Sequence, residues 1–107
     1  MTARISPAAA NDLLMIADYL GFNTTPGTLS KTFLNTAATT IAQLENSPDL
    51  GRLRITSNHR LQNLRSLSLD PPFTKYLLFY QEGTQGILIL RVLHGAQNLK
   101  QILGVIS

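Results

Sequence analysis

The sequence predicts an α+β fold in which an N-terminal helical hairpin packs on a small antiparallel β-sheet. Two segments with apolar residues at helical spacing come first, and the strand-like segments cluster after them. Residues 87–93 are apolar on both faces apart from Arg91, which is typical of a strand covered on both sides. The alternating residues 73–80 precede them, and a turn at residues 82–86 joins the two as an antiparallel hairpin. The expected order is β-α-α-β-β-β with a short C-terminal helix, in one domain over residues 1–107.

The first helix is predicted to follow a short edge strand at residues 2–5. Ser6 and Pro7 form the start signal, because serine caps the first turn and proline fits the first helical position. Gly21 is expected to end this helix as a C-cap. The apolar residues predicted to face the core are Ala10, Leu13, Leu14, Ala17 and Leu20.

The second helix has similar signals at both ends. Thr25-Pro26 repeats the start signal, and Asn46-Ser47-Pro48 stops the helix. A single apolar stripe runs between them, formed by Leu29, Phe33, Ala37, Ile41 and Leu44. The short connection between the two segments predicts an antiparallel helical hairpin.

The second half of the chain is predicted to supply the sheet. Residues 49–60 are expected to form a loop with basic residues at Arg52, Arg54, His59 and Arg60. Residues 61–69 alternate like a half-buried strand, and Asp70-Pro71-Pro72 ends it. After the central hairpin, helical spacing returns at Ala96, Leu99, Ile102 and Leu103, and residues 104–107 are expected to be a tail.

Composition excludes several classes of function. Apolar residues make up 44% of the 107 residues and charged residues 14%, which argues against disorder. The chain has no cysteine and neither a CxxC nor an HExxH motif, so no disulfide, metal site or cofactor is predicted. No apolar run reaches the length of a membrane span, and the N-terminus lacks the apolar core of a signal peptide. We therefore expect a cytoplasmic protein.

The charge is unevenly distributed along the chain. Residues 1–50 carry a net charge of −2, whereas residues 51–107 carry +5, from seven basic and two acidic side chains. A basic half favours an anionic partner, either nucleic acid or an acidic protein segment, although many small proteins with this imbalance bind no nucleic acid.

Three stretches of the sequence together resemble a known family. They are SPAAANDLLMIADYL at residues 6–20, IAQLENSPDLGRLR at residues 41–54, and YLLFYQEGTQGILILRVLHGAQNLKQIL at residues 76–103. The chain resembles the toxin subunits of the RelE/ParE superfamily, and most closely the ParE branch. The most specific part is Arg-Val-Leu-His-Gly-Ala at residues 91–96, which is similar to the family's ending of the last strand. The family continues with Arg-Asp where this chain has Gln97-Asn98, a difference that bears on toxicity more than on fold.

The resemblance implies a toxin of a type II toxin–antitoxin system, neutralised by a cognate antitoxin. Members of the ParE branch are associated with inhibition of DNA gyrase, and members of the RelE branch cut messenger RNA on the ribosome. We expect a toxin that acts by protein–protein contact, with its antitoxin bound along the helical hairpin and the sheet. The alternatives are a ribosome-dependent endoribonuclease and an inactive relative that only binds antitoxin.

The sequence offers few groups for RNA cleavage, which needs a base, an acid and cations for the phosphate. The candidates are Arg65, Lys75, Arg91 and His94. Because Arg91 and His94 are three residues apart, they face opposite sides of a regular strand. In the purely structural interpretation, His94 is a strand-end histidine bonded to backbone, and Arg91 pairs with Asp70 or Glu82. This set favours a toxin that is not an enzyme.

The residues predicted to bind a partner lie mainly in the basic loop and the C-terminal segment. They are Arg52, Arg54, Arg60, Arg91, His94, Gln97, Asn98 and Lys100. The loop either faces an acidic antitoxin segment or nucleic acid, or it is simply solvated. No aromatic residues are interleaved among its arginines, so neither stacking on single-stranded bases nor sequence-specific nucleic-acid binding is expected.

Overall fold

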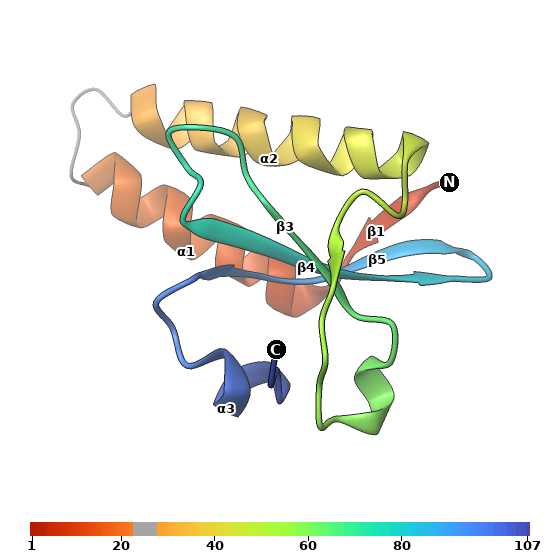
Figure 1. The fold of residues 1–107 in the computed structure, drawn as a ribbon. Coiled ribbons are helices and arrows are strands. Elements are labelled where there is room, and N and C mark those ends of the chain that lie inside the picture. The colour runs from red at the N-terminus through yellow and green to blue at the C-terminus, as the bar shows by residue number, and fades with distance from the viewer. Residues whose placement is uncertain (23–27) are drawn as a thin grey trace.

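Two long helices lie across one face of a five-stranded sheet in the computed structural model of the chain (Figure 1). The structure describes residues 1–22 and 28–107. The helices are α1 (Pro7–Phe22), α2 (Thr28–Asn46) and the short α3 (Leu99–Leu103), and the 3-10 turn η1 spans His59–Leu61. The strands are β1 (Ala3–Ile5), β2 (Arg52–Leu53), β3 (Arg65–Ser68), β4 (Tyr76–Gly83) and β5 (Gly86–His94). The α+β class is confirmed, and β2 and η1 are elements that the sequence did not predict.

The sheet is mixed, so the prediction of a purely antiparallel sheet is wrong in one pairing. Its order is β1-β5-β4-β3-β2, and β1 pairs with β5 in parallel. The direction of β1 is fixed at both ends, because the Ile87 amide donates to the Thr2 carbonyl and the Ser6 amide donates to the Ile89 carbonyl, both at 2.9 Å. Gly86 (φ 123°) permits this approach, since a Cβ atom there would collide with the Thr2 oxygen.

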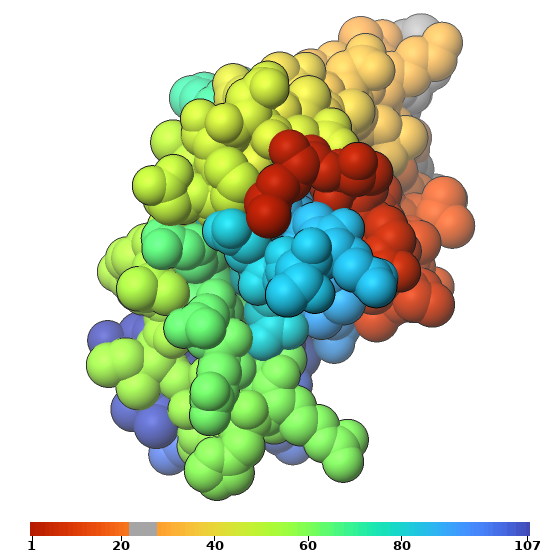
Figure 2. Space-filling view, turned by 90° about the vertical axis from the view of Figure 1, so that its right-hand side faces the viewer, coloured from red at the N-terminus to blue at the C-terminus, as the bar shows by residue number. Residues whose placement is uncertain are grey.

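The predicted edge strand is confirmed as β1, and the end of α2 bonds to the start of its outer edge. Figure 2 shows the N-terminal residues lying between the end of α2 and the β4–β5 turn. The ammonium group of Met1 donates to the Glu45 carbonyl at 2.7 Å, and the Ala3 amide donates to Glu45 Oε2 at 2.8 Å. The second of these bonds satisfies an amide that an edge strand otherwise leaves unpaired.

The central hairpin is tighter than the sequence predicts. Only Thr84-Gln85 separates β4 from β5, where we expected a loop over residues 82–86. The pairing shifts between Phe79 and Tyr80, which face Arg91 and Ile89 respectively. Leu90 is therefore an extra residue in β5, and this bulge increases the local twist.

Helix α1 begins as predicted, and three of its five predicted core residues, Leu13, Ala17 and Leu20, do face the core. The Ala9 amide donates to Ser6 Oγ at 3.0 Å, which confirms the serine cap. The helix continues through Gly21, so the prediction that Gly21 ends it is wrong. Ala10 and Leu14 were predicted to face the core but are exposed, Leu14 to 68%. The residues that face the core are Ala9, Leu13, Ile16, Ala17 and Leu20. The buried face of α1 is shifted from the predicted one because it also includes Asp12, whose carboxylate points toward the sheet.

Helix α2 buries the predicted stripe. Phe33, Ala37 and Leu44 are fully buried, and Leu29 and Ile41 are half-buried against the same core. The helix ends at Asn46, as predicted, whereas the predicted start signal at Thr25-Pro26 lies outside the described residues. The ring of Phe33 meets Phe73 and Tyr76 edge-on, with centroids 5.3 Å and 5.4 Å apart.

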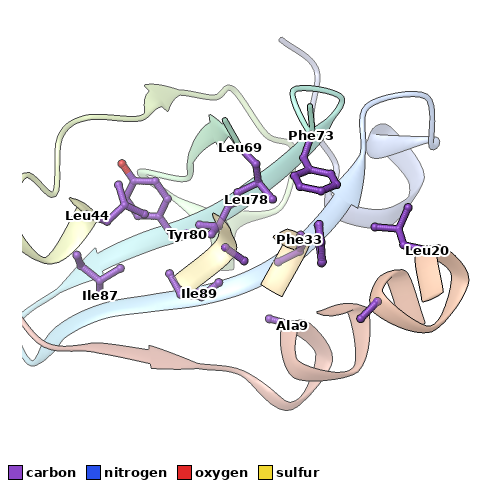
Figure 3. Close-up of a cluster of buried hydrophobic side chains, with 13 residues drawn as sticks. Ala9, Leu20, Phe33, Leu44, Leu69, Phe73, Leu78, Tyr80, Ile87 and Ile89 are labelled. Atoms are coloured by element: carbon purple, nitrogen blue, oxygen red, sulfur yellow. The ribbon is translucent and has the colours of Figure 1, made fainter. Parts of the chain in front are cut away.

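Apolar side chains pack on both faces of the sheet, which confirms the prediction for β5. Ile87, Ile89 and Val92 join the helix-side core (Figure 3). Leu93 points to the opposite face, into a smaller core with Leu64, Phe79, Leu103 and Val105. The alternation of β4 is likewise confirmed, with Leu78 and Tyr80 on the helix side and Leu77 and Phe79 on the other.

The C-terminal residues 104–107 are not a tail, contrary to prediction. Gly104 (φ 69°) ends α3 in the left-handed conformation, and Val105 is buried in the smaller core. Ile106 donates to the carbonyl of Ile55 at 2.7 Å, and the Ile55 amide donates to the Ser107 oxygen at 3.0 Å. These bonds attach the end of the chain to the segment that follows β2.

The predicted loop at residues 49–60 contains β2, and Tyr80 anchors its start. The buried phenol donates to the Pro48 carbonyl and accepts from the Gly51 amide, both at 2.8 Å. A Cβ atom on Gly51 would lie 2.6 Å from the phenolic oxygen, so only glycine fits there. The predicted strand at residues 61–69 shortens to β3, because Asn63 adopts φ 60° just before it.

Candidate functional site

Arg91 and Asp12 form an ion pair where β5 extends beyond β1. Arg91 Nε lies 2.7 Å from Asp12 Oδ2, and Arg91 Nη2 lies 2.9 Å from Asp12 Oδ1. The Val92 amide also donates to Asp12 Oδ2 at 2.9 Å. These hydrogen bonds raise the pKa of Arg91 above its usual value, against the opposite effect of burial. The predicted partners, Asp70 and Glu82, are therefore wrong.

The position of this pair follows from the length of β1. Because β1 ends at Ile5, the backbone of β5 beyond Ile89 has no neighbouring strand on that side. The first turns of α1 take the strand's place, with Ser6 Oγ donating to the Leu90 carbonyl at 2.8 Å and Asp12 accepting from Val92. Sequence reasoning missed Asp12. The available signal was an acid between Ala9 and Leu13 on an otherwise apolar helix face.

His94 ends β5 and is held by local contacts. Its Nδ1 accepts from the Ala96 amide at 3.0 Å, and its own amide donates to Gln97 Oε1 at 2.8 Å. Its ring meets the edge of Tyr76, with centroids 5.3 Å apart. The predicted bond between the imidazole and backbone is present, and it assigns the proton of neutral His94 to Nε2.

A cavity of about 400 Å³ opens beside His94, between α1 and the strand ends. Its lining is mainly apolar and includes Met15, Ile16, Tyr19 and Tyr76, with Asp12 at one side. Met15 and Tyr19 are each 63% exposed, as is Leu14 to a similar degree further round the helix. The outer side of α1 thus presents an apolar surface next to a groove.

The four candidate nuclease residues are not brought together. Arg65 Nη1 donates to the carbonyls of Asp49 and Gly51, at 3.2 Å and 2.7 Å, and so supports the start of β2. Lys75 lies exposed before β4, opposite Gly95. His94 pairs with Tyr76 and Arg91 with Phe79, two positions on opposite faces of β4, as predicted from their spacing. Within the described residues, none of the four forms a hydrogen bond or ion pair with another.

The arginines of the predicted basic loop do not lie together in the fold. Arg54 lies 5.6 Å above the ring of Phe79, and donates to Ser66 Oγ at 2.9 Å and to the Ser107 oxygen at 3.0 Å. Burial, and then the neighbouring charge of Arg52, lower the pKa of Arg54. Arg60 is exposed on η1, away from this pair, and its carbonyl accepts from Gln81.

The predicted polar positions near α3 have unequal roles. Gln97 holds the amide of His94, and Asn98 caps α3 by accepting from the Gln101 amide at 3.2 Å. Lys100 is exposed. No helix within the described part of the chain is both long and apolar enough to span a membrane. The same residues contain no group of three or more histidine, aspartate or glutamate side chains placed to hold a metal ion.

Comparison with known proteins assigns the family. The model of the family described as "ParE toxin of type II toxin-antitoxin system, parDE" matches residues 3–99. The chain belongs to the ParE toxin family. A solved structure titled "Chromosomal ParDE TA system from P. aeruginosa" has the same fold as this ParE-type toxin, with a TM-score of 0.70 and 18% sequence identity. The match covers 88% of this chain and 95% of that one. No curated protein matches the sequence.

Membership of the ParE family confirms the resemblance seen in the sequence and implies an antitoxin partner. The match includes α1, the β4–β5 hairpin and the strand end with Arg91 and His94.

Proposed function

We propose that this ParE-type toxin inhibits DNA gyrase by direct protein–protein contact, and that a cognate antitoxin neutralises it. The observation that carries the proposal is the engagement of Arg91. Its guanidinium makes two hydrogen bonds to Asp12, and its side chain is only 30% exposed. To reach a phosphate, Arg91 would have to leave a carboxylate that also holds the backbone of Val92. This arrangement favours a structural role over transition-state stabilisation.

The surface proposed to meet gyrase is the outer side of α3. Lys100 and Gln101 are exposed there, while Leu103 is buried on the inner side. Gln97 and Asn98 shape this surface through their bonds to the backbone. An inhibitor of this kind needs a rigid exposed surface and no proton relay, which agrees with the local bonding of His94.

The surface proposed to meet the antitoxin is the apolar groove beside α1. Leu14, Met15 and Tyr19 are more than half exposed, although soluble proteins usually cover such a group of side chains. An amphipathic helix fits a groove of this kind with apolar residues one helical turn apart. The groove reaches His94, so a helix bound there also approaches the end of β5.

Binding of purified gyrase to immobilised toxin tests the proposal. We expect binding by the unmodified toxin, at least about tenfold weaker binding by Lys100→Glu, and little change for Lys31→Glu. Lys31 is an exposed α2 residue, so it controls for the change in charge. A thermal melt of each variant separates lost contact from lost fold. Absence of binding at micromolar concentration, or ribosomal A-site cuts that disappear in Arg91→Ala, would overturn the proposal.

A further inference from the structure

A second cleft lies on the sheet face opposite α1 and α2. Its volume is about 570 Å³, and it runs from β2 across β3 to the start of α3. Arg52 and Arg54 form its basic side, and Ser66 and Ser68 form part of its floor. Apolar side chains complete the lining, among them Leu50, Leu77 and Leu99. Figure 1 shows this side of the sheet, with α3 and η1 below it.

Neither arginine has an aspartate or glutamate side chain as a partner. Within residues 1–22 and 28–107, the only ion pair joins Arg91 to Asp12. Arg54 is held by Ser66 and the Ser107 oxygen through Nη1 and Nε, which leaves Nη2 directed to no acceptor among the described residues. Arg52 is exposed beside Arg54, and its side chain also has no hydrogen-bond acceptor among the described residues. Two adjacent guanidinium groups repel each other, and a bound carboxylate relieves that repulsion.

The sheet edge beside the cleft is open at a single residue. The Arg54 amide donates to the Leu64 carbonyl, so the backbone groups of Arg52 and Arg54 point toward β3. Those of Leu53 therefore point away from the sheet. The next outward groups, on Ile55, are already bonded to residues 106 and 107. Leu53 is not among the residues that line the cleft, so its amide and carbonyl can serve only a part of an extended segment that lies along this edge.

The lining favours a polypeptide over a nucleic acid. Single-stranded nucleic acids bind through exposed aromatic rings, and of the described residues that line the cleft none is aromatic. Phe79 is fully buried beneath Arg54 and offers no face for a base. Leucine side chains instead offer contacts to apolar residues of a peptide, and the arginines select carboxylates among them.

The geometry points to a binding site for an acidic, extended polypeptide segment in this cleft, with its carboxylates paired to Arg52 and Arg54. Its apolar side chains pack against Leu50, Leu77 and Leu99. The inference deepens the proposed function and rests on it, because the antitoxin is the partner expected to carry the segment. Its site is distinct from the groove beside α1, so one antitoxin chain can occupy both faces of the sheet.

The probe is a short synthetic peptide of alternating glutamate and leucine, titrated into isotope-labelled toxin and followed by amide chemical shifts. We expect shifts at Arg52, Ser68 and Leu99, and binding at least about tenfold weaker in Arg52→Glu. The matched control is Arg60→Glu, an exposed arginine of the same segment outside the cleft, which should change affinity by less than about twofold. A second peptide has glutamine in place of glutamate. Its affinity for the unmodified toxin should be as low as the affinity of the glutamate peptide for Arg52→Glu. Both variants should melt like the unmodified protein.

Three results would overturn the acidic-peptide site. They are equal weakening by the two arginine variants, equal binding of the glutamine peptide, and binding of single-stranded oligouridine at these residues with no binding of the peptide. Capture of the antitoxin by tagged toxin then separates the two proposals. If the unmodified toxin and Arg52→Glu capture antitoxin equally, the cleft is not part of that interface and this inference fails while neutralisation stands. If the peptide binds but no antitoxin is captured, the cleft stands and the antitoxin is removed as its ligand.

Discussion

At the scale of single residues, two buried polar groups join distant parts of the chain. Asp12 connects α1 to β5 across 79 and 80 positions of sequence, through Arg91 and Val92. Tyr80 connects β4 to the turn after α2, through Pro48 and Gly51. Both groups have hydrogen-bond partners in place, which is the condition for burying polar atoms without a large loss of stability.

The first prediction concerns the Asp12–Arg91 pair. Asp12→Ala should lower the free energy of unfolding by about 1–3 kcal/mol, because it leaves a partly buried guanidinium and the Val92 amide without an acceptor. Asp18→Asn, an exposed change on the same helix, should stay within about 0.5 kcal/mol of the unmodified protein. Urea unfolding measures both.

A double-mutant cycle isolates the pair from the rest of the site. The double variant Asp12→Ala/Arg91→Ala should lose less free energy of unfolding than the sum of the two single variants. Arg91→Ala removes the guanidinium charge that Asp12→Ala leaves without a partner. Strict additivity of the two effects would contradict a direct interaction.

The second prediction concerns Tyr80 at alkaline pH. Burial raises the pKa of Tyr80 above 10.0, with smaller opposing contributions from the Gly51 hydrogen bond and Arg65. Because the folded state holds the proton more tightly than the unfolded state, this contribution is complete below pH 10 and is lost as pH rises through the folded pKa. The stability of Tyr80→Phe should therefore fall less steeply above pH 10 in urea titrations. Parallel curves for the two proteins would show that Tyr80 does not titrate as the structure requires.

At the scale of elements, much of this fold follows from local patterns. The serine cap of α1, the stripe of α2 and the doubly buried β5 were all predictable, because each depends on spacing within one segment. What spacing could not predict depends on neighbours far away in sequence. The parallel direction of β1 depends on its pairing with β5. The buried face of α1 includes Asp12 because the Val92 amide of β5 has its hydrogen-bond acceptor there. A strand as short as β2 carries no periodic signal at all.

The third prediction tests the close packing at the start of β2. Gly51→Ala should destabilise the protein by about 1–3 kcal/mol, because its Cβ would lie 2.6 Å from Tyr80 Oη and 2.9 Å from the Ser66 carbonyl. Gly83→Ala is the matched control, since the nearest atom to its Cβ is 3.8 Å away. Equal midpoints of thermal unfolding for the two variants would contradict the packing described for Gly51.

The fourth prediction tests whether the C-terminal residues belong to the fold. Val105→Ala should cost roughly 1–3 kcal/mol, because it removes buried methyl groups from the smaller core. Ile106→Ala removes a side chain that is 63% exposed and should stay within about 0.5 kcal/mol. A free tail would give two equally small effects in chemical unfolding.

At the scale of the whole molecule, the fold divides its surface into three regions. The groove beside α1 is apolar, the outer side of α3 is polar, and the cleft under the sheet is basic. Sequence reasoning named Gln97, Asn98 and Lys100 in the second region from the motif, but only Arg52 and Arg54 in the third from composition. It did not separate Arg52 and Arg54 from Arg60, because that division depends on where β2 and η1 lie. It also missed the exposed side of α1, because apolar residues on a helix were taken as core.

The account of this ParE-type toxin as a contact inhibitor is tested most directly by gyrase supercoiling of relaxed plasmid. Purified toxin should inhibit the reaction in a manner that saturates with the ratio of toxin to gyrase, and equimolar antitoxin should restore supercoiling. Lys100→Glu should inhibit at least about tenfold less at an unchanged melting temperature. Supercoiling that proceeds unchanged at micromolar toxin, while the same preparation cuts translated messages, would contradict the account.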